Sequence, residues 1–507
     1  MSANRIKMYL TSYSEEVTGS NNHVKIKWPD GREVSFLIVC GLFQEPVHNH
    51  INYDKLKYNP ENISFAIATH VHTDHIGRFP YIVRKGFNGK IFTSSETAIL
   101  LATVLSESAA RLDDEYRGNL KKYKEAKVNA IIKKLNAKGR GRRDYQRREF
   151  RKCKECEYLV KEKAPFLLYD RDDIDNTIKL VCAYKLNETF SPYPGVEITF
   201  YPNAHIAGAV ITVCRIFDEN EENFILFTGD LGLTNPLTNV KTSVPKEVID
   251  KINILVSEST YGSSEYSKNT VEQREFHKQI IKKCLEKNGT IMYLSNSLER
   301  PLILGIDLKK MQNEKDTKKL LSNCNIFFDT TFGINCLKKY KKIYGDEYLP
   351  ENFSIIDKDS REASLSKQGP KIFICTSPKL KQGSFLNYGS KMLEDPNVTL
   401  IFVAYVPPEV RNFINLPYGT EIKFLGEDVK VRCKRYQFGY YSSHVSMQEM
   451  DEFMDLFENT KVILFNHGSN DSKVNYTKRY KTDNNTTHNL LFGETVMITK
   501  NGIEKYF

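Results

Sequence analysis

The 507-residue sequence lacks the features that mark membrane-spanning and secreted proteins. No apolar run approaches the roughly 20 residues that a membrane-spanning helix needs. Residues 1–16 contain no apolar stretch of the kind found in signal peptides. The ten cysteines are scattered without the spacing of a disulfide framework, which favours a reducing compartment. We therefore expect a cytoplasmic protein with no membrane partner.

The rest of the composition is ordinary. Hydrophobic residues make up 40% of the chain and charged residues 27%, as in typical globular proteins. The length is enough for two or three domains, and no internal repeat is visible. One C-x-x-C pair, Cys153 and Cys156, supplies only half of a structural zinc site. Two ordinary cysteines are therefore the favoured interpretation.

Positive charge is concentrated in one segment. Residues 111–163 contain 19 Lys and Arg against 9 Asp and Glu, while the whole chain has a net charge of +10. This concentration points to a polyanionic partner such as nucleic acid, or to docking on a protein or ribosome; a solvated helical face is the alternative. An amphipathic helix is expected at 94–105, followed by two helices joined by a basic tip. The candidate RNA-contacting arginines of this segment are Arg140, Arg142, Arg143, Arg147 and Arg148.

Metal-ligand side chains are concentrated at residues 68–77. His70, His72, Asp74 and His75 fall within six residues, directly after an apolar run typical of a buried strand. Loops at strand ends commonly carry function on a rigid scaffold. Imidazole and carboxylate are common zinc ligands, so His70 and His72 can face one ion while Asp74 and His75 face a second. The alternative, a solvated polar loop, does not account for this density of ligands.

Four later strands are expected to end in residues of the same kind. Apolar runs lead into His205, Asp230, Glu258 and His467. Taken singly, a histidine after a strand is more often a hydrogen-bonded core residue. Repetition at four strand ends argues against coincidence. A carboxylate such as Asp230 can bridge two cations, and water between the cations can attack a phosphate in line.

Between residues 261 and 440 expected strands alternate with expected helices, which predicts βαβ units and a parallel sheet. Ligand-type residues resume after this stretch, so we expect a second α/β domain inserted into the first. The predicted division is a first part at 1–257 that includes the basic helical segment, an inserted domain at 258–440 and a return segment at 441–507.

The motifs resemble those of the metallo-β-lactamase superfamily, and of its β-CASP nucleases in particular. HVHTDHIG at 70–77 resembles the superfamily signature, and VTGS at 17–20 and CGLFQ at 40–44 resemble N-terminal motifs of the β-CASP branch. ESTYG at 258–262, Ser443-His444 and the FNHGS sequence around His467 resemble its three added motifs. The resemblance implies an α/β fold: an αββα metallo-β-lactamase sandwich with an inserted β-CASP parallel-sheet domain.

The resemblance also implies residue roles. One zinc ion is expected on His70, His72 and His205, a second on Asp74, His75 and His467, with Asp230 as the bridge. Asp74, Glu258 and His444 are the expected catalytic residues. Glu258 can keep His444 protonated, and a protonated His444 can donate to the leaving oxygen. The expected substrate-binding residues outside the basic segment are Ser259, Tyr261, Arg300 and Ser377.

By resemblance, His467 favours RNA over DNA as the substrate. We therefore predict a ribonuclease with two zinc ions and a bridging hydroxide, cutting single-stranded RNA in the cleft between the domains. Endonuclease action is favoured because the chain ends soon after His467, as in the compact mRNA 3′-end-processing type rather than RNase J. The sequence departs from the family at Val39, where an aspartate usually supports the site. An inactive or regulatory RNA-binding paralogue and a small-molecule hydrolase are the alternatives, and homodimer formation stays open.

Overall fold

A computed structural model gives the fold of residues 5–137, 165–263, 270–345, 349–376, 383–403, 408–500 and 502–507, together with Leu380 and Val406. Several residues singled out in the sequence lie outside the described residues: Arg140, Arg142, Arg143, Arg147, Arg148, Cys153, Cys156 and Ser377.

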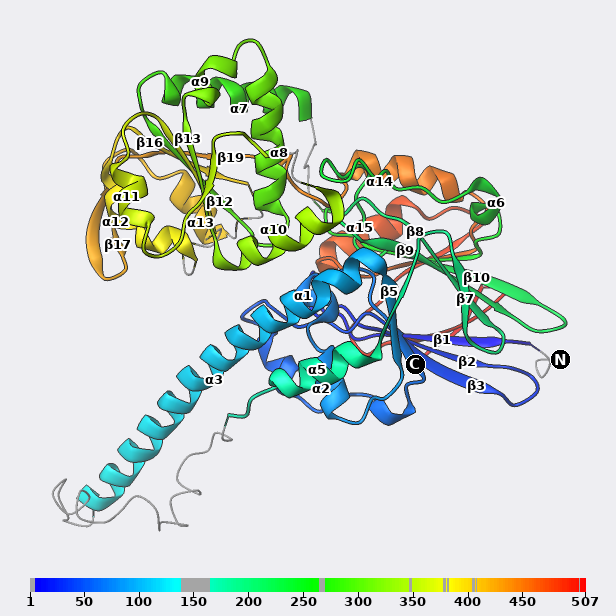
Figure 1. Cartoon of the computed structure of the whole chain (residues 1–507). Helices are drawn as coiled ribbons and strands as arrows, with labels where there is room; N and C mark the ends of the chain where they lie inside the picture. Colours follow the sequence, from blue (N-terminus) through cyan, green and yellow to red (C-terminus); the bar gives the residue numbers. More distant parts are fainter. Residues whose placement is uncertain are drawn as a thin grey trace.

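Two sheets lie face to face and form what we call the two-sheet domain, built from the described residues before 264 and after 437 (Figure 1). The first sheet has the order β23-β22-β1-β2-β3-β4-β5-β6 and the second has the order β21-β20-β11-β10-β9-β8-β7. The strands of the first sheet are β1 (Lys7–Ser12), β2 (Asn22–Lys27), β3 (Glu33–Ile38), β4 (Phe65–Ile67), β5 (Lys90–Ser94), β6 (Val181–Tyr184), β22 (Thr495–Thr499) and β23 (Gly502–Tyr506). Those of the second are β7 (Thr189–Tyr193), β8 (Val196–Pro202), β9 (Val210–Phe217), β10 (Glu222–Phe227), β11 (Ile254–Ser257), β20 (Val462–Phe465) and β21 (Thr486–Asn489).

Apolar side chains fill the space between these sheets. Val24 and Ile26 of β2 are buried while their neighbours are not, so the strand presents one apolar face. They belong to the same apolar cluster as Ile198 and Phe200 of β8 in the opposite sheet. Helices cover the outer faces and complete four layers: α1 (Thr73–Ile76), α2 (Phe79–Arg84), α3 (Ser95–Ala137) and α5 (Arg171–Leu180) on the first sheet, with α6 (Lys246–Ile249), α14 (Met447–Met454) and α15 (Asn470–Arg479) on the second.

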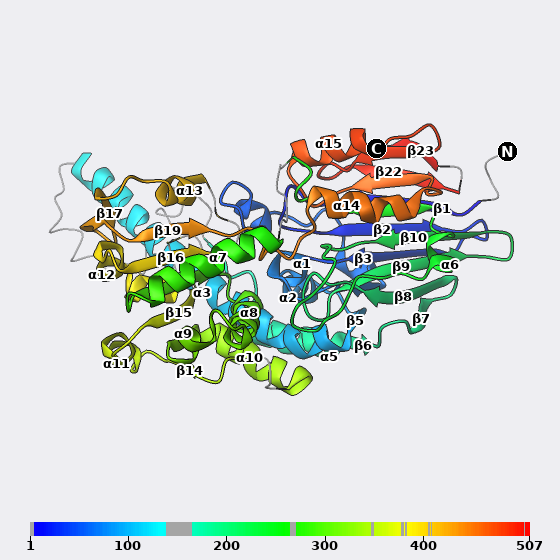
Figure 2. The same ribbon diagram turned by 90° about the horizontal axis from the view of Figure 1, so that it is seen from above.

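The third sheet belongs to what we call the inserted domain, residues 270–437 (Figure 2). Its order is β14-β13-β15-β12-β16-β19, and every neighbouring pair is parallel. The strands are β12 (Thr290–Ser295), β13 (Asn325–Asp329), β14 (Phe353–Ile355), β15 (Lys371–Thr376), β16 (Val398–Phe402) and β19 (Lys434–Gln437), with a separate hairpin of β17 (Thr420–Phe424) and β18 (Glu427–Val431). The helices are α7 (Thr270–Leu285), α8 (Arg300–Asn313), α9 (Lys318–Ser322), α10 (Thr331–Tyr344), α11 (Arg361–Ser366), α12 (Gly389–Glu394) and α13 (Pro408–Ile414).

The predicted fold class, an αββα sandwich with an inserted parallel-sheet α/β domain, is confirmed by this arrangement. The second sheet shows why the chain must return: its central strands β10 and β11 precede the inserted domain, whereas β20, paired with β11, follows it. The segment that returns after the inserted domain therefore lies beside the strands that lead into Asp230 and Glu258.

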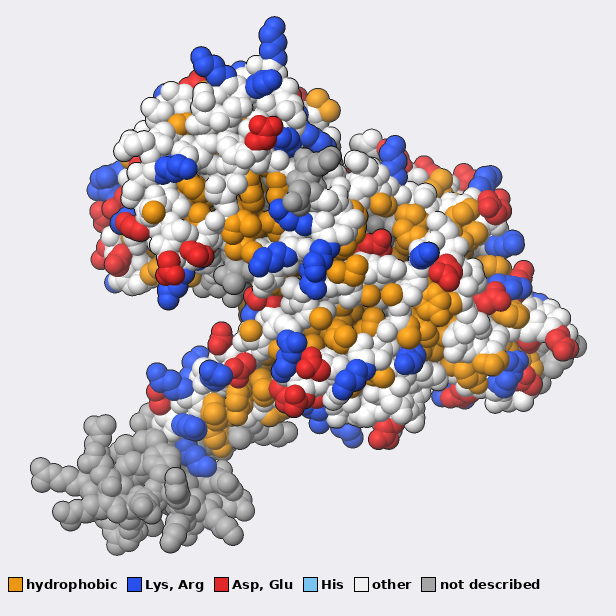
Figure 3. Space-filling view, viewed as in Figure 1, with side chains coloured by type: hydrophobic (Ala, Val, Ile, Leu, Met, Phe, Trp, Pro, Cys, Tyr) orange, Lys and Arg blue, Asp and Glu red, His pale blue; other side chains and the backbone are white. Residues whose placement is uncertain are grey.

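The prediction of a separate helix ending near residue 105 was wrong. α3 runs without interruption from Ser95 to Ala137, about 65 Å at 1.5 Å per residue, and projects from the body (Figure 3). No proline interrupts this stretch, and most of its residues are good helix formers such as Ala, Leu, Glu, Lys and Arg. Gly118 has open space around it, so it meets no packing constraint that would stop the helix. Of the two helices expected in the basic segment, the second falls outside the described residues.

Among the helices of the described residues, none is both long enough and apolar enough to cross a membrane.

Candidate metal centre

Strand ends from both sheets meet at one place. β4 of the first sheet leads into the loop that carries His70 and His72, and α1 begins directly after His72. In the second sheet, the neighbouring parallel strands β10, β11 and β20 lead into Asp230, Glu258 and His467. Because the carboxyl ends of parallel neighbours meet at one sheet edge, residues far apart in the sequence become adjacent.

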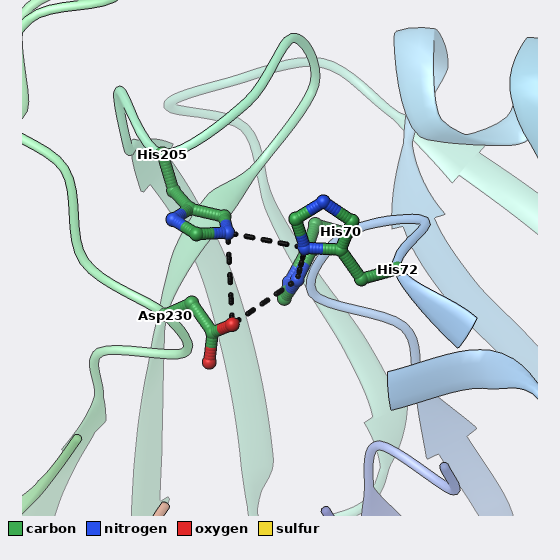
Figure 4. Close-up of side chains that lie close together, drawn as sticks. All are labelled: His70, His72, His205 and Asp230. Carbon is green, nitrogen blue, oxygen red and sulfur yellow. Dashed lines mark hydrogen bonds and ion pairs between the residues drawn. The ribbon is translucent and has the colours of Figure 1, made fainter. Parts of the chain in front are cut away.

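The first group contains His70, His72, His205 and Asp230 (Figure 4). Nδ1 of His72 lies 3.1 Å from Nε2 of His70 and 3.1 Å from Nε2 of His205. Oδ2 of Asp230 lies 3.6 Å from each of the same two Nε2 atoms. A neutral imidazole offers only one donor, so these nitrogens cannot all satisfy one another. A shared cation would satisfy them together.

The second group contains Asp74, His75, His467 and the other oxygen of Asp230. Oδ1 of Asp230 lies 3.0 Å from Nε2 of His75 and 3.3 Å from Nε2 of His467. Oδ1 of Asp230 and Nε2 of His467 are buried but have no hydrogen-bond partner among the described residues. Buried polar atoms without partners are costly, and a second cation facing Asp230 would satisfy both. The residues present therefore fit two metal ions that share Asp230.

Burial sets the protonation states. It is the main cause that lowers the pKa of His72 to about 4 and the pKa values of His70 and His205 well below the usual range. Metal binding needs neutral imidazole, so these three side chains are in the required state at neutral pH. Burial would raise the pKa of Asp230, but the facing imidazoles of His467 and His75 hold it well below its usual range. Asp230 is therefore a carboxylate.

Glu258 and His444 form a buried pair beside the metal ligands. Nδ1 of His444 lies 2.9 Å from Oε2 and 3.1 Å from Oε1 of Glu258, which is 1% exposed. Burial opposes protonation, but Glu258 more than compensates through its charge and hydrogen bond, so the pKa of His444 is raised. Nε2 of His444 lies 3.8 Å from Oδ2 of Asp230. Nε2 of His444 therefore faces the metal ligands, and the raised pKa favours the protonated form of the ring.

Thr260 and Asn203 are supporting residues that the sequence analysis missed. The hydroxyl of Thr260 contacts Glu258 and lies within 3.3 Å of Nδ1 of His444 and 3.2 Å of Nδ1 of His467. The Asn203 amide donates to the carbonyl oxygen of Asp230 at 2.7 Å, and its oxygen accepts the His205 N–H at 3.0 Å. Thr260 lies within the ESTYG motif and Asn203 lies two residues before His205, but nothing in the sequence reveals their partners.

Val39, Gly229 and His467 all have positive φ angles, a conformation that is uncommon for residues other than glycine. Their φ angles are 62°, 58° and 42°, and all three line one small cavity, which we call the base cavity. The base cavity, about 20 Å³ in volume, is also lined by Ser20, Asn22, Ile38, Thr69, His75, Phe227, Asp230, Val256 and Asn466. A β-branched residue such as Val39 is a genuine outlier at positive φ. The chain therefore turns sharply just after β3, β10 and β20, where these three residues lie.

The expected substrate-binding residues differ in their surroundings. Ser259 is buried and its hydroxyl donates to the carbonyl oxygen of Asn466 at 3.0 Å, so here it supports the His467 loop. The Tyr261 hydroxyl lies 3.1 Å from that of Ser442, and the Tyr261 ring packs edge-on against His444. Arg300 is half-buried at the first turn of α8. Their contact with substrate stays a prediction.

Three family models match the chain in order. The "Metallo-beta-lactamase superfamily" model matches residues 30–142, the "Beta-Casp domain" model matches 302–411, and the "Zn-dependent metallo-hydrolase RNA specificity domain" model matches 428–490. The chain is a β-CASP member of the metallo-β-lactamase superfamily. The first match includes the ligands from His70 to His75, and the third includes His444 and His467.

This β-CASP protein also resembles curated proteins along most of its length. Ribonuclease TTHA0252 of Thermus thermophilus is 20% identical over 96% of the chain and 98% of the relative. Cleavage and polyadenylation specificity factor subunit 3-II of Arabidopsis thaliana is 24% identical over 81% of the chain and 59% of the relative. Transcription termination factor FttA of Methanosarcina mazei is 23% identical over 74% of the chain and 52% of the relative. The chain thus spans little more than half of the last two relatives.

Proposed function

We propose that this β-CASP protein is a ribonuclease that hydrolyses single-stranded RNA with two zinc ions. The observation that carries the proposal is the position of Asp230, whose two oxygens face two separate sets of mostly buried ligand side chains. The "RNA specificity" family model and the names of the ribonuclease relatives support RNA as the substrate.

The bound ions would lower the pKa of a water molecule between them and neutralise charge on the phosphate. Asp230 holds the two ligand sets at a fixed separation, because its carboxylate is buried and its backbone is tied to Asn203. His444, kept protonated by Glu258, donates a proton from Nε2 to the leaving oxygen of the scissile bond. Thr260 restrains the Glu258 carboxylate and therefore the His444 ring.

The test is cleavage of end-labelled single-stranded RNA by protein loaded with Zn²⁺. His72→Ala and Asp230→Ala should abolish cleavage, because each removes a ligand from the centre. His50→Ala is the matched control, since His50 is exposed and its Nδ1 lies beside the Val47 carbonyl oxygen, away from the ligand groups. Retained cleavage in either ligand variant would reject the assignment. Internal fragments would establish endonuclease action, which we favour, and mononucleotides would establish exonuclease action.

An inactive or regulatory RNA-binding paralogue is the second candidate. Nδ1 of His75 has no hydrogen-bond partner among the described residues, and Val39 faces the same cavity. Metal-ligating histidines normally donate their outer N–H to a carboxylate, carbonyl or water, and losing that partner weakens metal binding. RNA binding without hydrolysis by protein that holds two zinc ions would favour this candidate.

A further inference from the structure

Glu299 belongs to the inserted domain, but its side chain accepts hydrogen bonds from residues of the two-sheet domain. It precedes Arg300, the first residue of α8, but its side chain makes no capping bond to that helix. Instead, Oε1 accepts the backbone N–H of Ala207 at 2.8 Å and the side-chain amide of Asn235 at 3.3 Å. The residue is only 6% exposed. A buried carboxylate with two donors from another domain is a specific contact, because burying it without them would be costly.

Ala207 belongs to the short loop that carries His205. The far end of this loop is fixed by the two-sheet domain itself: the Gly208 carbonyl oxygen accepts from the Ser94 hydroxyl at 2.6 Å and from the Thr97 hydroxyl at 2.9 Å. A Cβ at Gly208 would lie 2.7 Å from the Thr97 nitrogen, so the loop is pressed against the start of α3. The near end is fixed by Asn203. Glu299 holds the middle of the loop through its hydrogen bond with the Ala207 N–H.

A second contact brings the inserted domain to the same place. α10 packs against α3, and Phe332 and Leu337 of α10 share an apolar cluster with Leu101 of α3. Leu298, the neighbour of Glu299, is buried in that cluster. The apolar contact holds the inserted domain beside the start of α3, and Glu299 reaches the His205 loop from that position.

We propose that Glu299 is a positioning residue that holds His205 in the metal-binding geometry, so that docking of the inserted domain completes the first metal group. The inference rests on the proposed function only in taking His205 as a metal ligand. Both donors to Glu299 are neutral N–H groups, so the contact requires an acceptor oxygen at this position, and burial raises the pKa of Glu299 to about 7. Glutamine can provide that oxygen and alanine cannot.

Zn²⁺ affinity measured by competition with a chromophoric chelator tests the proposal on the full chain without RNA. For Glu299→Ala we expect about tenfold weaker binding of one of two equivalents, at the low end of the cost of removing outer supports of metal ligands. Glu299→Gln should bind like wild type. Absorption spectra of the Co²⁺-loaded protein should change in Glu299→Ala and not in Glu299→Gln, which reports on ligand geometry rather than on stability.

Glu314→Ala is the matched control. The Glu314 carboxylate pairs with Arg274 and Lys278 within the inserted domain, so its loss tests that domain's stability apart from the His205 loop. Wild-type Zn²⁺ affinity in Glu299→Ala, or an equal loss in Glu299→Gln or in Glu314→Ala, would overturn the proposal. If Glu299→Ala does not fold, Glu299→Asp withdraws the carboxylate by one methylene and is judged by the same criteria. Because metal binding is the readout, a wild-type protein that binds zinc but cuts no RNA rejects only the proposed function.

Discussion

Val39 and His75 line the same small cavity beneath the metal centre, and the outer ring nitrogen of His75, Nδ1, has no hydrogen-bond partner among the described residues. The outer nitrogens of His70 and His467, by contrast, lie 3.1 Å and 3.2 Å from the hydroxyls of Thr69 and Thr260. The base cavity has room for one water molecule, and Ser20 and Asn22 could share its hydrogen bonds. Within the described part of the chain, no side chain therefore orients His75, a proposed metal ligand, through its outer nitrogen.

Val39→Asp and Val39→Asn should therefore strengthen zinc binding. Both residues tolerate the left-handed backbone better than valine, and both bring an acceptor to the base cavity. An outer partner of a ligating histidine changes metal affinity by roughly 10–100-fold, and we expect the lower end of that range. Val39→Gly is the control, since it relieves the strained backbone without an acceptor. Chelator competition measures all three, and an equal gain in Val39→Gly would show that backbone strain, rather than the missing acceptor, limits affinity.

Glu258→Gln should move the alkaline limb of the pH–rate profile to lower pH. The charge and hydrogen bond of Glu258 raise the pKa of His444, while burial lowers it. If His444 acts as the acid, activity is lost as the pH rises through its pKa. Removing the Glu258 charge lowers that pKa, so the loss begins earlier. The measurement is kcat/KM for RNA cleavage across pH. If Glu258→Gln keeps the alkaline limb of the wild-type protein, His444 is not the general acid.

The basic segment should contribute phosphate contacts to RNA binding. α3 carries the chain away from the body as far as residue 137 (Figure 1), and the five candidate arginines follow in the sequence. Changing the five arginines of this stretch to glutamine keeps its length but removes five positive charges. With about 0.7 ions released per phosphate contact, the slope of log affinity against log salt should fall in magnitude by up to about 3.5. An unchanged slope would assign the segment to another partner.

The proposed metal ligands could be singled out in the sequence because His205, Asp230 and His467 each follow an apolar strand, and the segment from His70 to His75 follows another. Their division into two metal-binding groups needed the family resemblance, since His467 and its neighbours Asp74 and Asp230 lie hundreds of residues apart in the sequence. The contact between Glu299 and Ala207 joins residues 92 positions apart in two domains, and no local pattern encodes it. The positive φ of Val39 could not be predicted from the sequence either, because valine ordinarily favours the extended conformation of strands.

His277 should make the stability of the inserted domain depend on pH. Its ring is buried between the hydroxyls of Tyr293 and Tyr440, at 2.7 Å and 2.8 Å, with Tyr441 and Asp307 nearby. Burial lowers the pKa of His277 to about 4 from 6.5. Between pH 6.5 and pH 4, His277 binds a proton in the unfolded chain but not in the folded protein. Its contribution to the free energy of unfolding is therefore fully present above pH 6.5 and is lost as the pH falls toward 4.

The loss between pH 7 and pH 5 should be about 2 kcal/mol from this residue alone. His277→Gln keeps a donor and an acceptor for the two tyrosines but cannot take up a proton, so its unfolding free energy should fall less over the same range. Urea unfolding at pH 7, 6 and 5 compares the two proteins. Equal losses would mean that His277 is already protonated in the fold, and that Asp307, which raises its pKa, outweighs burial.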